Sequence, residues 1–275
     1  MVSVNWFCPK QLLCLRWWSA IPPGGVRSRI GASTLLYAIL SDIHANIDAL
    51  EVVLGRLDSL GVDEIVCLGD VVGYNAEPNA CVSLIAERGV QTILGNHDAV
   101  ACAIEEPWGF NPVALAAAVW TREKLDEPTL EWLRGLPDAL NYGPFVAVHG
   151  APKNHNVYLF SPEEIRPHLY FMDEQNCRLC FMGHTHTPAI FSTDGDYSLN
   201  GKTRIQLDPE KIYFINPGSV GQPRDDNPNA SFGLFDSDSM TFELVRTAYD
   251  VERASQRVRD ARLPRFLADR LLQGR

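Results

Sequence analysis

Side chains that bind metals or transfer protons recur at similar places along this 275-residue chain, directly after short apolar segments. The residues in these places are aspartate, asparagine and histidine. They are Asp42, His44, Asp70, Asn96, His97, Asp98, His149, His184 and His186. Five of the seven histidines belong to this set, and only His155 and His168 do not. A single histidine of this kind would be interpreted as a loop residue, but the whole set indicates a functional site.

The types of donor predict hard or borderline divalent cations. Carboxylate, amide and imidazole groups suit Mn²⁺, Fe²⁺ or Zn²⁺, and the set contains no thiolate that would favour a softer ion. The donors are also too many for one ion. Seven of them can be divided between two ions if one carboxylate bridges the pair, at the separation of about 3.5–4 Å that is typical of two-metal hydrolases.

The segments that precede these residues predict strands alternating with helices. Residues 46–60 place apolar side chains at helical spacing before Gly61, and residues 78–88 predict a second helix that ends at Gly89. The apolar runs that predict buried strands are residues 35–41, 64–68 and 90–94. Such units imply a mainly parallel sheet, and open α/β folds bind ligands at the carboxyl ends of their strands.

The rest of the chain predicts a helical middle and a β-rich second half. Residues 111–136 are expected to be helical, and Pro162 is expected to begin another helix. Two further strands, residues 145–150 and 178–184, end in the predicted ligands. Beyond Pro188, short strands suggest antiparallel hairpins. They are residues 189–193, 204–207, 211–218, 230–236 and 241–247.

We expect one domain, residues 35–250, with a further segment at each end. Residues 251–275 predict a helical segment that packs on the domain. Residues 1–34 are expected to be a leader outside the fold, either disordered or a start-site artefact with the natural start close to Leu35. Lys10 and Arg16 interrupt the apolar stretch of this leader, which argues against an export signal. No apolar run approaches the ~20 residues that a membrane helix needs.

The composition limits the partners that we expect. The formal net charge of −10 disfavours a stable nucleic-acid partner or an anionic membrane surface, so an anionic substrate needs a local positive feature. Seven cysteines make an odd number, and several lie in apolar segments, which predicts reduced thiols in the cytoplasm. Cys177 and Cys180 have CxxC spacing, but no second pair completes a zinc site, so we interpret them as two unrelated thiols.

The order and spacing of these motifs resemble the calcineurin-like metallophosphoesterases, whose signature is DxH, GD, GNH[DE], a lone His and GHxH. The matching segments are Asp42-Ile43-His44, Gly69-Asp70, Gly95-Asn96-His97-Asp98, His149-Gly150 and Gly183-His184-Thr185-His186. The likeness runs from about Leu35 to Asp250, and GDVVGYNAEPN and NPGSVGQPRDDNP resemble the small bacterial and archaeal phosphodiesterase branch. The resemblance implies an α/β fold, a layered α/β/β/α sandwich with mixed sheets and a metal site at the carboxyl ends of the strands.

The resemblance also implies a role for each residue of the set. It assigns Asp42, His44 and His186 to one metal, Asn96, His149 and His184 to the other, and Asp70 to both. The expected cofactors are two divalent ions, Mn²⁺ first, with Fe²⁺, Zn²⁺, Ni²⁺ or Mg²⁺ as alternatives. A hydroxide shared by both ions would attack phosphorus. His97 would protonate the leaving group as a general acid. Asp98 is expected to orient the imidazole of His97, because the two residues are adjacent in the sequence. Arg224 has two open interpretations, a contact to the substrate oxygens and a solvated turn residue.

The function expected from this resemblance is that of a phosphodiesterase acting on a small nucleotide-type or related phosphodiester. The protein Ser/Thr phosphatases of the superfamily carry an arginine shortly after GD, where this chain has Val71 to Asn75, so a phosphoprotein is a weaker substrate candidate. Ala151 also stands where this branch often has serine. A phosphoprotein or phosphomonoester phosphatase and a non-catalytic scaffold of the same fold stay open as alternatives.

Overall fold

The computed structural model describes residues 35–193, 195–196 and 203–275. The expected leader, residues 1–34, lies outside the described residues. Apolar residues dominate the interior, as the composition predicts, and they form contiguous clusters on both faces of two sheets. No helix in the part of the chain that is described has both the length and the apolar character needed to cross a membrane.

The first sheet combines three parallel strands from the start of the chain with antiparallel strands from its second half. Within the described residues it has six strands in the order β3-β2-β1-β11-β12-β9. Their bounds are β1 Leu36–Leu40, β2 Glu64–Cys67, β3 Gln91–Thr92, β9 Arg204–Gln206, β11 Ala230–Asp236 and β12 Thr241–Thr247. Strands β1, β2 and β3 run parallel, as the strand–helix–strand pattern predicts, while β11 pairs antiparallel with β1.

The second sheet is also mixed. In the described part of the chain it has the order β4-β5-β6-β10-β7-β8. Its strands are β4 Ala139–Asn141, β5 Val146–Val148, β6 Leu179–Phe181, β7 Ala189–Ser192, β8 Gly195–Asp196 and β10 Tyr213–Asn216. Strands β5, β6 and β10 run parallel, and β4 and β7 pair antiparallel with their neighbours.

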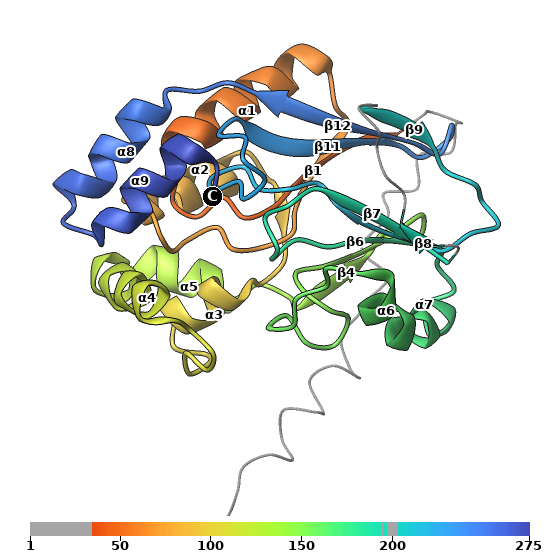
Figure 1. Cartoon of the computed structure of the whole chain (residues 1–275), viewed down its shortest axis with the longest axis horizontal. Helices are drawn as coiled ribbons and strands as arrows, with labels where there is room; N and C mark the ends of the chain where they lie inside the picture. Colours follow the sequence, from red (N-terminus) through yellow and green to blue (C-terminus); the bar gives the residue numbers. More distant parts are fainter. Residues whose placement is uncertain (1–34, 194, 197–202) are drawn as a thin grey trace, which may run out of the picture.

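The two sheets pack face to face, and helices cover their outer faces (Figure 1). Tyr37 of β1 contacts Phe145 edge to face with ring centroids 5.0 Å apart, and Phe181 of β6 meets Phe235 of β11 at 5.6 Å. Helices α1 and α2 pack on the first sheet, and α6 and α7 pack on the second. The predicted α/β/β/α sandwich with mixed sheets is therefore confirmed.

The helices that the sequence predicted begin and end close to the expected boundaries, but the sequence did not predict the short helix α3, Asn96–Ala101. Asn46 caps α1 through a bond from the Ala49 amide to its side chain, and Gly61 ends that helix with a φ of 66°. The bounds are α1 Ile47–Leu60, α2 Pro78–Glu87, α3 Asn96–Ala101, α4 Pro112–Lys124, α5 Glu127–Arg134, α6 Pro162–Ile165, α7 Leu169–Glu174, α8 Val251–Asp260 and α9 Arg265–Gln273. A 3₁₀ turn, Arg166–His168, joins α6 to α7.

Two details of the β-rich half differ from the prediction. Strands β11 and β12 form the expected antiparallel pair, but β9 lies beside β12 in the first sheet, whereas β7 and β8 lie in the second. Strand β10 pairs in parallel with β6 on one side and antiparallel with β7 on the other. These pairings join segments that are distant in the sequence, and a hairpin pattern does not encode them.

The C-terminal helices α8 and α9 lie at the same end of the sandwich as α3, α4 and α5 (Figure 1). Ion pairs attach α8 to α1, because Asp48 binds Arg253 at 2.6 Å and Arg257 at 3.0 Å. Residues of α9 pack in one apolar cluster with Tyr74 and with α4. This packing brings the end of the chain next to the loops that follow β1 and β2.

Candidate metal centre

The residues predicted to bind metal lie where strands of both sheets end. Asp42 and His44 follow β1, and Asp70 follows β2. Asn96 opens α3 after the short strand β3. His149 follows β5, and the pair His184 and His186 follows β6. All seven are at most 5% exposed, so the fold brings them into one buried place.

The first group of ligand-type side chains consists of Asp42, His44, Asp70 and His186. The two imidazole Nε2 atoms lie 3.0 Å apart. His44 Nε2 is 3.4 Å from Asp70 Oδ2, and His186 Nε2 is 3.3 Å from Asp42 Oδ1. Four donors from three loops therefore converge on one point.

The hydrogen bonds of the two imidazoles fix their tautomers. His44 Nδ1 bonds the Val72 carbonyl at 3.0 Å, and His186 Nδ1 bonds the Gln222 carbonyl at 2.7 Å. A carbonyl oxygen only accepts, so each Nδ1 carries the proton and each neutral ring presents a bare Nε2 to the other. This is how metal-binding histidines are usually held, because the outer hydrogen bond orients the ring and leaves the inner nitrogen free.

The second group consists of Asp70, His149 and His184, with Asn96 beside it. His149 Nε2 lies 3.3 Å from Asp70 Oδ2 and 3.1 Å from Asn96 Oδ1. His149 Nδ1 donates to the Leu68 carbonyl at 2.8 Å, as the Nδ1 atoms of His44 and His186 do to their backbone carbonyls. Asp70 Oδ2 therefore faces both groups, and the other oxygen of this carboxylate accepts a bond from the His97 amide at 2.8 Å.

Several of the inward-facing atoms find no hydrogen-bond partner among the described residues. They are Asp42 Oδ1, Asp70 Oδ2 and His184 Nε2, which are buried atoms with lone pairs that can bind a cation. A buried polar atom without a partner costs about 1–3 kcal/mol, and a carboxylate oxygen costs more. A cation between these atoms would satisfy all three, so the residues fit a pair of divalent ions.

Burial and mutual repulsion keep most of the imidazoles in the neutral form that binds metal. Burial is the main cause that lowers the pKa of His44, His184 and His186 well below the usual value. For His149, burial also favours the neutral form, but the carboxylate of Asp70 outweighs it and raises the pKa to about 9. The proton on His149 Nε2 thus lies between Asp70 and Asn96, where a cation would otherwise lie.

The backbone adopts a left-handed conformation at five of the seven predicted ligands. Their φ angles are 54° at Asp42, 48° at His44, 55° at Asp70, 68° at His184 and 60° at His186. Residues other than glycine rarely adopt this region, and each such position costs about 1 kcal/mol or more. Backbone strain of this kind is common at functional sites. Here it directs into the site side chains that an unstrained loop would expose.

Glycine in the GNHD motif allows a close approach between loops. A Cβ on Gly95 would lie 2.8 Å from Cγ of Asp70, so a larger residue would displace the carboxylate that faces both groups. Asp98 supports the same turn, because its Oδ1 accepts the Val72 amide at 3.0 Å and its Oδ2 accepts the Gly95 amide at 3.1 Å. Both carboxylate oxygens of Asp98 therefore bond to the backbone, whereas the sequence predicted that Asp98 orients the His97 imidazole.

His97 lies beside the two groups without belonging to either. The centroid of its ring lies 4.3 Å from the ring centroid of Tyr74, 4.6 Å from that of Phe110 and 5.0 Å from that of His44. Burial lowers the pKa of His97 to about 4, against the opposing effect of Asp70. The ring is therefore neutral at pH 7.

Arg224 lies over Tyr74, with the guanidinium carbon 5.6 Å from the ring centroid. Its amide donates to the His186 carbonyl at 3.2 Å, which places the loop after β10 directly on the GHTH turn. Asn216, from the same region, donates to the Gly183 carbonyl at 2.7 Å. The arginine that the sequence suggested for substrate binding is thus next to the first group.

Sequence reasoning missed the aromatic residues around the site. Tyr158 stacks on His184 with ring centroids 3.8 Å apart, and Tyr74 and Phe110 enclose His97. Tyr74 stands inside the GDVVGYN segment, so that motif carried a signal for it. Tyr158 and Phe110 lie in loops with no recognisable motif, and only the three-dimensional arrangement identifies them.

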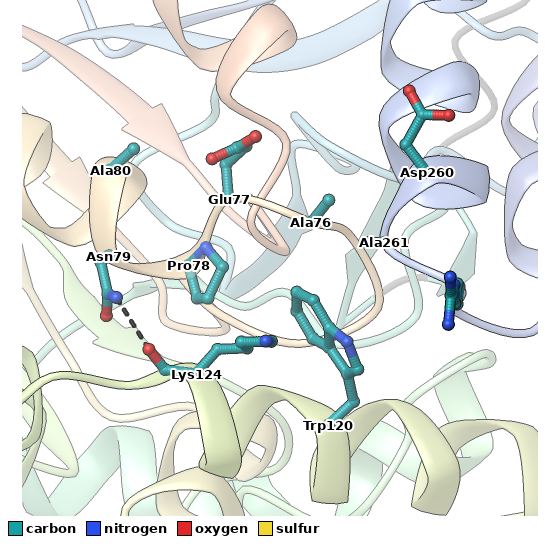
Figure 2. Close-up of a pocket in the computed structure, with 10 residues that line it drawn as sticks. Ala76, Glu77, Pro78, Asn79, Ala80, Trp120, Lys124, Asp260 and Ala261 are labelled. Atoms are coloured by element: carbon teal, nitrogen blue, oxygen red, sulfur yellow. Dashed lines mark hydrogen bonds between the residues drawn. The ribbon is translucent and has the colours of Figure 1, made fainter.

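A separate cavity of about 390 Å³ lies between the start of α2, the end of α4 and the turn after α8. Figure 2 shows Trp120 and Lys124 of α4 on one side, Glu77 and Pro78 on another and Asp260 of α8 on a third. None of the predicted metal ligands lines this cavity. The predicted chemistry therefore belongs to the two ligand groups and not to this cavity.

Comparison with known proteins agrees with this geometry. The family model described as the calcineurin-like phosphoesterase superfamily domain matches residues 35–240. An uncharacterized protein of Methanocaldococcus jannaschii is 37% identical over 246 residues, which cover 87% of this chain and 98% of that protein. The phosphodiesterase YfcE of Escherichia coli K12 is 28% identical over 211 residues, which cover 73% of this chain and 87% of that protein.

Solved structures give the same result. A metallophosphoesterase from Sphaerobacter thermophilus superposes with a TM-score of 0.75 at 33% identity, covering 88% of this chain and 100% of that one. A hypothetical protein from Pyrococcus horikoshii has the same fold, with a TM-score of 0.73 at 19% identity over 88% of this chain and 99% of that one. The chain therefore belongs to the calcineurin-like phosphoesterase superfamily, as its motifs indicated.

Proposed function

We propose that this protein is a two-metal phosphodiesterase that hydrolyses a nucleotide-type or related phosphodiester. The observation that carries the proposal is the buried oxygen Asp70 Oδ2, which faces both ligand groups and lies 3.4 Å from His44 Nε2 and 3.3 Å from His149 Nε2. The likeness to a curated phosphodiesterase supports the diester over other phosphate esters.

In this proposal each of the two ligand groups would hold one divalent ion. Asp42, His44 and His186 would hold the first, Asn96, His149 and His184 would hold the second, and Asp70 would serve both. Ions held in this way supply the acidity that turns water into a nucleophile and the positive charge that offsets the phosphate. Mn²⁺ is the proposed native pair, since carboxylate, amide and imidazole donors suit it, and Fe²⁺, Zn²⁺, Ni²⁺ and Mg²⁺ are the alternatives to test.

His97 is the proposed general acid. Its ring is neutral in the structure because burial lowers its pKa to about 4. A phosphate anion bound against the ring would raise this pKa, because the negative charge stabilises the imidazolium. The imidazolium could then give its proton to the leaving oxygen, which is the transfer that a general acid performs.

Arg224 and Asp98 support this reaction in different ways. The Arg224 guanidinium over Tyr74 is the proposed contact to the non-bridging phosphate oxygens. Asp98 is a positioning residue, since its bonds to the Val72 and Gly95 amides hold the two loops that carry Asp70 and His97.

The proposed location is the cytoplasm. Within the described part of the chain, five cysteines are free and buried, which suits a reducing compartment. Fractionation of cells that express the native gene, with detection of this protein in each fraction, tests the location.

The experiment for the proposed function uses bis-p-nitrophenyl phosphate and Mn²⁺. We expect the purified protein to release p-nitrophenol, EDTA to abolish the release, and Asp70→Asn to remove nearly all turnover, because the amide cannot bridge two cations. Asp58→Asn is the matched control, since that carboxylate is exposed and pairs with Arg88 on the surface. Full activity in Asp70→Asn would contradict the assignment.

A non-catalytic scaffold of the same fold would not need two metal ions per chain, so the metal content separates this alternative from the proposed enzyme. The ligand set of the family motif is complete in this chain, and the fold brings all of it together. Elemental analysis of the purified protein should therefore find two ions per chain. A screen against nucleotides, cyclic nucleotides, dinucleoside polyphosphates, phosphomonoesters and phosphopeptides would then identify the class of substrate.

A further inference from the structure

Three stacked rings lead from the second ligand group to the surface of the protein. The Tyr158 ring lies nearly parallel to the His184 imidazole, at an angle of 18° and with the centroids 3.8 Å apart. The Phe160 ring lies nearly parallel to that of Tyr158, at 13° and 5.5 Å. His184 is buried, whereas Tyr158 is 42% exposed and Phe160 is 60% exposed. The stack therefore begins at a predicted metal ligand and ends in a ring that solvent reaches.

The local chain explains why both exposed rings lie on the same side. Leu159, between them, is buried and belongs to the apolar cluster on the outer face of the second sheet. Exposed and buried side chains alternate in this way where the chain is extended, because residues two apart then point to the same side. The Phe160 amide also donates to Glu164 Oε2 at 2.6 Å, which attaches this residue to α6.

The loop that carries the two rings folds back closely onto the backbone after His149. A Cβ on Gly150 would lie 2.6 Å from the His155 carbonyl oxygen and 2.7 Å from that of Val157, so glycine is needed at this position. The Ala151 amide donates to the Val157 carbonyl at 3.0 Å. These backbone contacts fix the residue that precedes Tyr158 next to a predicted ligand.

Glu105 attaches this loop to a second loop at the site. Its Oε2 lies 3.1 Å from His155 Nε2 and accepts a hydrogen bond from Asn156 Nδ2 at 3.0 Å. Glu105 belongs to the segment between α3 and α4, which also carries Phe110, the residue whose ring contacts that of His97. The loop with the two rings thus borders the site and is held there by side-chain contacts as well as by its backbone.

The loop offers aromatic surface and little free positive charge. Residues 151–160 contain one lysine and no arginine, and that lysine, Lys153, pairs with Glu174 at 2.8 Å. Large rings that stay in water forgo the free energy of burial, so two such rings next to each other suit a flat apolar partner. Nucleobases stack on aromatic side chains in this way, largely regardless of sequence, because every base has a π-face.

We propose that Tyr158 and Phe160 form a stacking platform for a nucleobase of the substrate, the base of the nucleoside attached to the phosphate that is cleaved. The inference rests on the proposed function, since the contact of Tyr158 with His184 places the platform beside that phosphate. It narrows the substrate to diesters that contain a nucleoside. Diesters of glycerol or of other alcohols without a ring would use the metal groups but leave the platform empty.

The first test measures equilibrium binding by calorimetry to the full-length protein loaded with Mn²⁺. The probes are adenosine 5′-phosphate and ribose 5-phosphate, which share the sugar phosphate and differ in the base. We expect the nucleotide to bind about tenfold more tightly, within the range that stacking of one base supplies. Phe160→Ala should remove most of this preference and leave the affinity for ribose 5-phosphate unchanged.

Two further variants separate stacking from simple burial of apolar surface. Phe160→Trp keeps a flat ring and should keep the preference for the nucleotide, whereas Phe160→Leu keeps apolar volume without a flat face and should lose most of it. Elemental analysis of each variant should give the metal content of the wild type, because the Phe160 ring stacks on Tyr158 and not on a predicted ligand.

Tyr170→Ala is the matched control, since Tyr170 is a 71% exposed aromatic residue of α7, on the outer face of the second sheet. It should bind both probes like the wild type. Equal affinity of the wild type for the two probes, or no measurable binding of the nucleotide, would overturn the platform. So would an equal loss of both affinities in Phe160→Ala, or a change of mass in solution with the preference for the nucleotide intact, which would indicate a contact with a second copy of the chain.

A second test separates the platform from the proposed function. The substrates are the dinucleoside phosphodiester adenylyl-3′,5′-adenosine and the ring-free diester glycerophosphocholine, both with Mn²⁺. We expect a higher kcat/KM for the dinucleoside diester, and Phe160→Ala should reduce this difference. If the wild type hydrolyses neither diester, the proposed function fails, while a preference for the nucleotide in calorimetry still supports the platform. If it hydrolyses both equally and calorimetry shows no preference, only the platform fails.

Discussion

At the scale of single residues, the first ligand group is defined by two imidazole nitrogens that face each other without a proton between them. His44 Nε2 and His186 Nε2 lie 3.0 Å apart, and both rings are held by bonds from Nδ1 to backbone carbonyls. Two lone pairs at this distance repel unless a positive charge lies between them. The free protein tolerates the arrangement because the surrounding loops fix it, and a cation would turn this repulsion into ligand bonds.

A His97 variant tests whether this residue acts in acid catalysis and not in metal binding. We expect His97→Ala to lower kcat by about 10²–10⁴-fold, the usual range for the loss of a general acid, on a dinucleoside phosphodiester, whose alkoxide leaving group needs the proton. The metal content should stay at two ions per chain, since the His97 ring belongs to neither ligand group. Elemental analysis and steady-state kinetics on the same preparation measure both quantities.

His168→Ala is the control for that experiment, because His168 lies on the 3₁₀ turn before α7, on the outer face of the second sheet. Its kcat should match that of the wild type. Loss of one metal ion in His97→Ala would instead identify His97 as a ligand.

His149 makes metal binding depend on pH. In the metal-free protein Asp70 raises the pKa of His149 to about 9, against burial, so the imidazole carries a proton at pH 7. An ion must displace this proton, because only the neutral ring is a ligand. Affinity for Mn²⁺ should therefore rise with pH, by up to about tenfold per unit between pH 7 and 8.5, and level off above pH 9.

Calorimetry in buffers of different ionisation enthalpy measures both the affinity and the protons released. At pH 7 we expect release of about one proton for the ion that His149 binds. An affinity that is constant from pH 7 to 8.5, with no proton release, would be incompatible with His149 as a ligand.

At the scale of elements, the ligand-type side chains at the strand ends have fixed positions because neighbouring loops are hydrogen-bonded to one another. Asp98 is fully buried and accepts the Val72 and Gly95 amides, which joins the loop after β2 to the start of α3. Asn75 donates to the His44 carbonyl at 2.7 Å, and Ser219 donates to the Asp42 carbonyl at 2.7 Å. Such bonds offset the cost of the left-handed backbone at the ligands.

Asp98→Ala should therefore damage both stability and catalysis. Two buried amides would lose their acceptor, and we expect the free energy of unfolding to fall by about 2 kcal/mol or more. We also expect a lower kcat, because the Asp70 and His97 loops would no longer be fixed relative to each other. Urea denaturation of the metal-free protein and kinetics of the metal-loaded protein measure the two effects. Asp58→Ala, an exposed control, should change neither, and a stable, fully active Asp98→Ala would show that these bonds are dispensable.

Local sequence signals predicted the elements well and their long-range pairing poorly. The strand before Asp42, the helix from Ile47 to Leu60 and the ligand-type side chains that cluster in the fold could be predicted from short segments, because periodicity and motif spacing are local. The place of β9 in the first sheet and of Tyr158 on His184 depends on packing between distant segments.

At the scale of the whole molecule, the site lies at the junction of two sheets. The first sheet leads into Asp42, His44, Asp70 and Asn96, and the second leads into His149, His184 and His186. Each proposed ion therefore takes ligands from both sheets. Bound metal would link the two halves of the sandwich in addition to the aromatic contacts between them.

This arrangement predicts that metal stabilises the entire fold and not only its loops. At a free Mn²⁺ concentration of 100 times Kd, one site adds about 2.7 kcal/mol to the free energy of unfolding, which for a domain of this size raises Tm by roughly 5–10 °C. Hydrogen exchange should slow at the ends of β1 and β6 together, because the ions join them. Asp70→Asn should show little of either effect. If Mn²⁺ protected only the β1 loop and left the β6 loop unchanged, the ions would not connect the sheets, and the shared role of Asp70 would be wrong.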